Sequence, residues 1–193
     1  MDAQAWDQRY AAEPALWGAD LNPVVAPFLR EMSPGNAVDL ACGNGRHAAW
    51  LADHGWRCTG VDFSPVAIEQ ARTRSTRAQW QVADALTWQP VEALDLVLVA
   101  YLHLPLDDMR RVLRRCLSWL SPAGTLVQVG HARVNIAHGV GGPQDPLILP
   151  TVASVADGLD DEVLVRRLEH AERVTEQGTA IDLLLVAQRL ARP

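Results

Sequence analysis

Apolar residues gather in short runs along the chain, and stretches with helical spacing separate these runs. The run from Leu94 to Ala100 is apolar except at Asp95, which is typical of a strand buried on both faces of a sheet. Because predicted strands alternate with predicted helices, the pattern indicates a parallel sheet with helices on both sides. The predicted strands cover residues 36–40, 56–61, 79–83, 94–100 and 125–130.

Local signals set the ends of the predicted helices. Ser64 is a suitable N-cap residue, and Pro65 suits the first helical position after it. Gly55 suits the position just after a helix end. We expect helices at about residues 45–54, 65–75 and 106–120, a turn at 121–124 and a short helix at 151–158.

The first 35 residues precede the first predicted strand and show no strand-like alternation. Trp6, Arg9 and Tyr10 have the i, i+3, i+4 spacing of one helix face, so we expect a helix that starts near Asp2. Pro14 should end this helix, because proline does not continue a helix interior. A second helix is predicted over residues 22–32.

The last third of the chain changes in composition. Residues 131–150 are rich in glycine and proline, which predicts a long loop of the kind that often serves as a functional lid. Residues 162–173 and 179–189 then read as two strands joined by a turn at Gln177 and Gly178.

Residues 38–64 predict a strand, a glycine turn, a helix and a second strand, which is a βαβ unit with a nucleotide site in its first turn. Gly43, Gly45 and Ala48 form the pattern G-x-G-x-x-A, which allows a sharp turn and a close approach of the backbone to a ligand. Asp62 ends the second strand, where a carboxylate can accept hydrogen bonds from both hydroxyls of a ribose.

An acidic residue, Asp39, precedes the glycines, where a dinucleotide site usually has an apolar run. A carboxylate there would repel a phosphate but suits a cationic ligand. The pattern D-x-x-C-G-x-G from Asp39 to Gly45, followed by VDFS at residues 61–64, resembles the S-adenosylmethionine site of class I methyltransferases. The segment from Ala37 to Ser64 is most similar to small bacterial methyltransferases of the tellurite-resistance and thiopurine methyltransferase group.

The resemblance implies an α/β fold: a single Rossmann-like three-layer sandwich whose mostly parallel seven-stranded sheet ends in a C-terminal antiparallel hairpin. It also implies S-adenosylmethionine as the cofactor, bound beyond the carboxyl ends of the strands. Asp39 and the glycine turn would meet the methionine part, Asp62 the ribose and Asp84 the adenine amino group, although Asp62 and Asp84 could instead be helix-capping or surface acids. The expected cofactor-binding residues are Trp6, Arg9, Tyr10, Trp17, Asp39, Ala41, Gly43, Gly45, Asp62, Phe63, Asp84, Ala85, Ala100 and Tyr101.

The aromatic residues near the start of the chain, Trp6, Tyr10 and Trp17, have two explanations. Aromatic residues on a helix face are most often part of the core. A sulfonium ion is attracted to aromatic faces, however, so a lid that stacks over the cofactor is also reasonable. Arg9 could pair with the methionine carboxylate or remain an exposed helix arginine.

Methyl transfer from a sulfonium is an in-line displacement, so a protein contributes mainly by holding the two reactants in place. Few catalytic residues are then required. His103 and His131 follow the fourth and fifth predicted strands, and we expect them as catalytic candidates, each a base or an orienting donor. A histidine is otherwise more often structural or solvated. No metal site is expected, because Cys42, Cys58 and Cys116 lack metal-ligand spacing.

The length of 193 residues with 49% apolar residues favours one methyltransferase domain over residues 1–193. Its parts would be an N-terminal helical cap at 1–35 and a Rossmann-like core at 36–193. The formal net charge of −6 argues against a nucleic-acid partner, which would require a basic face. We expect a small-molecule substrate, no membrane span or signal peptide, and a cytoplasmic protein; the oligomeric state stays open.

Three functions are therefore considered. The first is an S-adenosylmethionine-dependent methyltransferase acting on a small molecule, for which the resemblance points to a thiol or a selenium or tellurium species. The second is an NAD-dependent oxidoreductase with the same glycine turn, against which Asp39 and Asp84 both count. The third is a protein that binds the cofactor without turnover.

Overall fold

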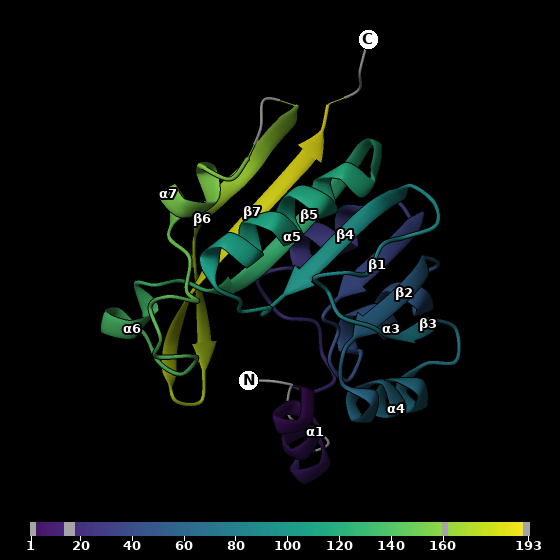
Figure 1. Cartoon of the computed structure of the whole chain (residues 1–193), viewed down its shortest axis with the longest axis horizontal. Coiled ribbons are helices and arrows are strands. Elements are labelled where there is room, and N and C mark those ends of the chain that lie inside the picture. The colour runs from purple at the N-terminus through teal and green to yellow at the C-terminus, as the bar shows by residue number, and fades with distance from the viewer. Residues whose placement is uncertain (1–2, 14–17, 160–161, 191–193) are drawn as a thin grey trace.

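The computed structural model describes residues 3–13, 18–159 and 162–190. This part of the chain forms a seven-stranded sheet in the order β3-β2-β1-β4-β5-β7-β6 (Figure 1). The strands are β1 (Asn36–Leu40), β2 (Arg57–Asp62), β3 (Gln79–Val82), β4 (Leu94–Ala100), β5 (Leu120–His131), β6 (Val163–Thr175) and β7 (Gly178–Arg189). The helices are α1 (Ala3–Ala12), α2 (Ala26–Glu31), α3 (Arg46–Asp53), α4 (Pro65–Arg74), α5 (Leu106–Trp119), α6 (Asn135–His138) and α7 (Val152–Ala156).

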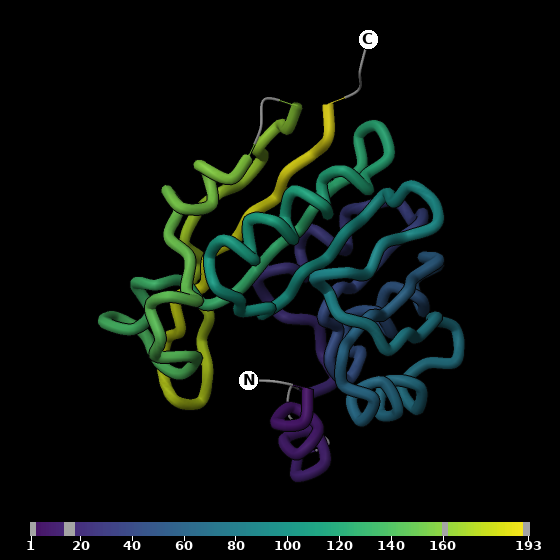
Figure 2. Tube along the Cα trace, viewed as in Figure 1, coloured from purple at the N-terminus to yellow at the C-terminus, as the bar shows by residue number. Residues whose placement is uncertain are grey.

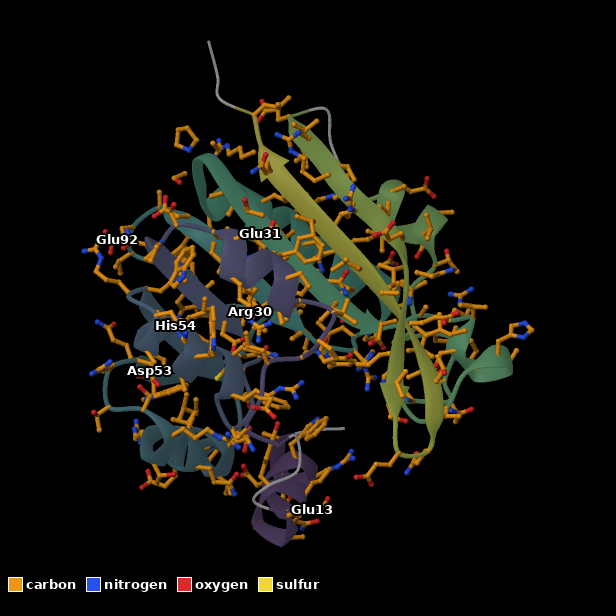
Figure 3. All side chains as sticks on the ribbon, turned by 180° about the vertical axis from the view of Figure 1, so that it is seen from behind. Glu13, Arg30, Glu31, Asp53, His54 and Glu92 are labelled. Carbon is orange, nitrogen blue, oxygen red and sulfur yellow. The ribbon has the colours of Figure 1, made fainter. Side chains whose placement is uncertain are left out.

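The sheet is the middle layer of three. Helices α5 and α7 cover one face, where Val112 and Val155 join the buried residues of β1, β4 and β5. Helices α2 and α3 cover the other face, where Leu29 and Leu51 are fully buried. Figure 3 shows this second face from behind, with α2 in front of the strands and with Arg30 and Glu31 labelled on it. The predicted three-layer sandwich is confirmed.

The strand directions divide the sheet in two. Pairings from β3 through β5 are parallel, whereas β7 runs antiparallel to both β5 and β6. The antiparallel hairpin at the C-terminal end of the sheet is therefore confirmed. Strand order reverses between β1 and β4, and ligands in open α/β sheets bind beyond the carboxyl ends of the strands at such a point.

The parallel register brings the carboxyl ends of the strands to one edge. Leu40 of β1 lies opposite both Val61 of β2 and Val99 of β4. Ala100 of β4 in turn lies opposite Val129 of β5. The residues that follow these strands therefore meet at one edge of the sheet, as the sequence predicts.

Strand β5 differs from the prediction, because it begins at Leu120 rather than at residue 125. Leu120 already pairs with Leu94, and the next pair joins Thr125 to Leu96, so residues 121–124 form a bulge within the strand. Ala123 takes a positive φ of 65° there. The predicted turn is present, but the strand continues on both sides of it.

The predicted loop over residues 131–150 contains the short helix α6 and is tied to the β6–β7 hairpin. Ala132 N donates to Ile181 O at 3.0 Å, and Val140 N donates to Thr179 O at 3.2 Å. Figure 2 shows the tip of the hairpin beside this loop. The loop and the hairpin together form one wall beyond the carboxyl end of β5.

Two further findings concern the described residues only. No helix among them is long and apolar enough to cross a membrane. Cys42, Cys58 and Cys116 are all buried and free.

Candidate functional site

The glycine loop leaves β1 by a sharp turn. Ala41, Gly43 and Gly45 all have positive φ, at 60°, 56° and 79°, a region that glycine enters without steric cost. Cys42 N donates to Val61 O at 2.9 Å, which ties the loop to the end of β2. A Cβ atom on Gly45 would collide with the ring of Trp80, so glycine is required there for packing as well.

Asp62 joins the two strand ends. Its Oδ2 accepts a hydrogen bond from Gly43 N at 2.8 Å, and its Oδ1 accepts one from Ser64 N at 2.9 Å. Burial raises the pKa of this carboxyl, and the two backbone N–H groups oppose that rise. A carboxylate has about four acceptor positions, so Asp62 can hold the loop and still accept from a ligand hydroxyl.

Asp39 is fully buried at the end of β1. Its Oδ2 accepts a hydrogen bond from Ala48 N at 3.1 Å, whereas its Oδ1 has no hydrogen-bond partner among the described residues. Burial raises the pKa of this carboxyl to about 7, Arg46 lowers it and Asp62 raises it further. A buried carboxylate with one open oxygen is costly unless a partner satisfies it, and a cationic ligand would do so.

A chain of polar contacts leads from Asp39 toward the end of β4. His47 Nδ1 lies 4.0 Å from Asp39 Oδ2, and His47 Nε2 accepts a hydrogen bond from Asn22 N at 3.3 Å. Burial lowers the pKa of His47 to about 3, so its ring is neutral near pH 7. Asn22 Nδ2 then donates to Tyr101 Oη at 2.8 Å.

Tyr101 connects this chain to a second buried acid, Asp182 of β7, which is fully buried. Tyr101 Oη donates to Asp182 Oδ2 at 2.5 Å, and Arg173 Nε donates to the same oxygen at 2.7 Å. Tyr101 also takes a positive φ of 60°, which is uncommon for a bulky residue and is typical of functional sites. Four polar side chains, from the N-terminal segment and from three strand regions, therefore meet here.

His103 and His131 lie side by side, with ring centroids 5.7 Å apart. His103 Nε2 accepts a hydrogen bond from His131 N at 3.2 Å. Burial lowers the pKa of His103 to about 4, and His131 lowers it further. Burial also lowers the pKa of His131. Both rings are therefore neutral near pH 7, and the structure brings them together with Tyr101 as predicted from their strand ends.

Helix α1 packs beside α4 and reaches the glycine loop. Ser64 Oγ donates to Asp7 Oδ1, and Gln70 Nε2 donates to Tyr10 O at 2.8 Å. Tyr10 is buried, and a Cβ atom on Gly43 would collide with its hydroxyl. One predicted lid residue therefore lies on the loop.

The other predicted lid residues differ in what the structure shows. Trp6 lies beside Tyr10 with ring centroids 5.7 Å apart, and the Arg9 guanidinium lies over the Trp6 ring. Trp17 is outside the described residues. The cap predicted over residues 1–35 remains a prediction: α1 reaches the glycine loop, whereas α2 packs against the sheet.

The end of β3 is arranged differently. Asp84 is exposed, and its Oδ1 accepts a hydrogen bond from Leu86 N at 2.8 Å, which closes a turn and does not cap a helix, because no helix begins among the described residues between β3 and β4. Ala85 beside it is buried, and Phe63 and Ala100 are half-buried at their own strand ends. A contact of Asp84 with adenine remains a prediction.

The sequence analysis missed Asn22, His47, Arg173 and Asp182. Only Asp182 carried a local signal, since it interrupts the otherwise apolar run of β7. Its partners lie in other elements, which a local pattern does not show.

A shallow depression lies at the opposite edge of the sheet, lined by Trp56, Asp95 and Gln188 among others. Trp56 and Asp95 stand at the amino ends of β2 and β4, and Gln188 of the antiparallel strand β7 lies opposite Thr125 of β5. Ligands of open α/β sheets bind instead at the carboxyl ends of the parallel strands. We therefore place the candidate site at the glycine loop.

Comparison with known proteins identifies a related family and related folds. Residues 37–124 match the family model described as "Methyltransferase domain". The trans-aconitate 2-methyltransferase of Methylobacterium radiotolerans is 31% identical over 159 residues, which make up 80% of this chain and 58% of that protein. The chain thus spans little more than half the length of this curated relative.

Two solved structures share the fold. TehB from Haemophilus influenzae has a TM-score of 0.73 at 13% identity, over 95% of this chain and 67% of that one. The N-methyltransferase NodS from Bradyrhizobium japonicum, in complex with S-adenosyl-L-homocysteine, has a TM-score of 0.66 at 20% identity, over 98% and 99%. The family match and the seven-stranded fold together place this chain among proteins with the class I S-adenosylmethionine-dependent methyltransferase fold.

Proposed function

We propose that this protein transfers a methyl group from S-adenosylmethionine to a small-molecule acceptor. The observation that carries the proposal is Asp39, a buried carboxylate whose Oδ1 has no partner among the described residues. The cofactor carries an ammonium and a sulfonium group and no phosphate. The residues present fit such a ligand, because Asp39 can pair with a cation, whereas it would repel a pyrophosphate at the same loop.

In this proposal each strand end holds a different part of the cofactor. Asp39 pairs with the ammonium group, Asp62 accepts from the ribose hydroxyls, and Gly43 lets the backbone come close to the ligand. The remaining expected contacts come from Trp6, Arg9, Tyr10, Trp17, Ala41, Gly45, Phe63, Asp84, Ala85, Ala100 and Tyr101. When bound, S-adenosylmethionine supplies an electrophilic methyl group, so the protein has mainly to orient the acceptor and exclude water.

For the acceptor we propose a small thiol or a selenium or tellurium species. Such nucleophiles ionise easily, so a weak base is enough to deprotonate them. This fits a site whose candidate bases, His103 and His131, are half-buried and have lowered pKa values. A second candidate is a carboxylate, which needs no deprotonation at all. It is favoured by the relative named for trans-aconitate and by the Arg173 guanidinium beside Tyr101.

Calorimetric titration tests the proposed function. We expect micromolar binding of S-adenosylmethionine and S-adenosylhomocysteine and no heat from NAD(H). Tight NAD(H) binding without S-adenosylmethionine binding would instead support an oxidoreductase. A panel of thiols, selenite and tellurite under reducing conditions, and small polycarboxylates, followed by release of S-adenosylhomocysteine, then separates the two acceptor classes. Cofactor binding without turnover on any of them would favour a binding protein.

The domain organisation, the location and the kind of partner are part of the same proposal. We propose one domain over residues 1–193 and a cytoplasmic location, since the three cysteines are free. The net charge of −6 supports a small-molecule partner over a nucleic acid.

A further inference from the structure

The surroundings of His131 distinguish it from His103. Both ring nitrogens of His103 are engaged: Nε2 accepts from His131 N, and the ring also makes a hydrogen bond with the backbone of Tyr101. His131 Nδ1, in contrast, makes no hydrogen bond among the described residues, and it lies 3.4 Å from Asp182 Oδ1. Because Nδ1 is buried beside Asp182 while the His131 side chain keeps 12% of its surface exposed, a substrate can reach this ring only through its Nε2 edge.

The faces of the His131 ring are covered. His103 stacks on the ring at an interplanar angle of 19°. A Cβ atom on Gly142 would lie 2.6 to 2.8 Å from Cδ2, Cγ and Nε2 of His131, so this glycine packs directly against the ring. Tyr101 contacts it edge to face, with centroids 5.3 Å apart. The ring is thus held in one plane, with the Nδ1 edge toward Asp182 and Nε2 directed away from it.

We propose that Asp182 is a positioning residue that holds His131 with its proton on Nδ1, so that His131 Nε2 acts as the base for the acceptor. Asp182 can do this because Arg173 and Tyr101 fix its carboxylate from the other side. A thiol or selenol acceptor passes its proton to Nε2 of His131, whereas a carboxylate acceptor has no proton to pass. The electron pair left on the acceptor atom forms the bond to the methyl carbon, and the pair of the broken carbon–sulfur bond stays on sulfur.

The charged and titratable groups around His131 set its pH response. Asp182 of β7 raises the pKa of His131, whereas Arg173 of β6 lowers it. His103 and Tyr101, which follow β4, also face the ring. Loss of the Asp182 charge should therefore lower the pKa of His131 further.

This inference rests on the proposed function, but its first test needs no cofactor. Nitrogen NMR of the intact protein should show neutral His131 near pH 7 with its proton on Nδ1. In Asp182→Asn we expect a lower His131 pKa and a shift of the proton toward Nε2. Glu169→Gln removes one negative charge from an exposed position on the same hairpin and should change neither.

Activity provides the second test. In Asp182→Asn, kcat should fall by roughly a hundredfold, which is the lower end of what general-base catalysis supplies. The fall of kcat on the acid side of its pH profile should also move to lower pH. This kcat is measured at saturating S-adenosylmethionine, because Asp182 holds Tyr101, an expected cofactor contact, and its loss should also raise the cofactor Kd. In His131→Gln, kcat should no longer fall on the acid side of its pH profile.

Three results would overturn the proposal: an Nε2-protonated His131 in the parent protein, an unchanged tautomer in a folded Asp182→Asn, or an unchanged kcat in that variant. The first of these needs no variant, so the proposal stays testable if Asp182→Asn does not fold. A protein that shows the expected tautomer but binds no S-adenosylmethionine would overturn the proposed function instead.

Discussion

Cofactor affinity should depend on pH through Asp39. Burial raises the pKa of this carboxyl to about 7 in the ligand-free protein, and the cofactor's ammonium group should bind only the ionised form. With that pKa, about one tenth of the molecules carry the carboxylate at pH 6 and about nine tenths at pH 8. The apparent Kd for S-adenosylmethionine should therefore be about tenfold lower at pH 8 than at pH 6.

Protonation of His47 or His103 does not contribute to this change in Kd between pH 6 and pH 8. The pKa of His47 is lowered to about 3 and that of His103 to about 4, so both are neutral throughout the range. Asp39→Asn keeps the acceptor for Ala48 N and removes the charge. It should bind roughly ten- to hundredfold more weakly than the parent at pH 8, as expected for the loss of a charge-assisted hydrogen bond. The Kd of this variant should hardly vary with pH, and any variation that remains is assigned to titration of Asp62.

The free energy of unfolding of the ligand-free protein should fall as the pH rises, whereas cofactor affinity rises. The folded-state pKa of Asp39 of about 7 lies above its ordinary value of 3.8, so between these pH values the native state holds a proton that the unfolded state has lost. The stabilising contribution of Asp39 is fully present below about pH 4 and is lost as the pH rises through 7. Thermal unfolding of the ligand-free protein should show this loss, and the shift in Tm on adding cofactor should grow from pH 6 to pH 8. A Kd that is flat from pH 6 to pH 8 in the parent protein would refute this reasoning about Asp39.

Three further predictions follow from the contacts of the site. Asp62→Ala should cost about 2 kcal/mol of cofactor binding, roughly thirtyfold in Kd by calorimetry, whereas Asp84→Ala should cost less; an unchanged Kd in a folded Asp62→Ala would remove the ribose assignment. Tyr10→Ala, which exposes the glycine loop, should weaken cofactor binding about fivefold, and an unaltered titration would assign Tyr10 to packing alone. In Gly142→Ala the added Cβ should push against the ring of His131 and lower kcat about tenfold, with little change in cofactor Kd. A kcat equal to that of the parent protein in steady-state assays would show that the loop around residue 142 moves to accommodate the Cβ.

The core of the fold and the geometry of the candidate site at the glycine loop could be predicted, because both depend on local patterns. Asp39, Gly43 and Asp62 lie within one βαβ unit, and the parallel register brings the two strand ends together. The position of α1 was not accessible in the same way. Its place beside α4 depends on Asp7 and Gln70, polar contacts between helices that no hydrophobic pattern records.

The bulge in β5 shows a second limit of local patterns. Residues 121–124 contain a proline and a glycine, and local propensity predicts a turn that precedes the strand. Leu120 nevertheless pairs with Leu94, because the neighbouring strand offers hydrogen-bond partners before the bulge as well as after it. Strand pairing, rather than the sequence near the turn, decides where β5 begins.

The two buried acids of the site, Asp39 and Asp182, show why one half of it was predicted and the other was not. Asp39 is held by Ala48, nine positions along the chain, so a single motif contains both the carboxylate and its donor. Asp182 is opposite His131 in the antiparallel β5–β7 register and is 81 positions from Tyr101. The Asp182 carboxylate therefore joins the site only after the β6–β7 hairpin has paired with β5. If the hairpin places Asp182, then a change of strand register there should disturb the acceptor side of the site and leave the glycine loop intact.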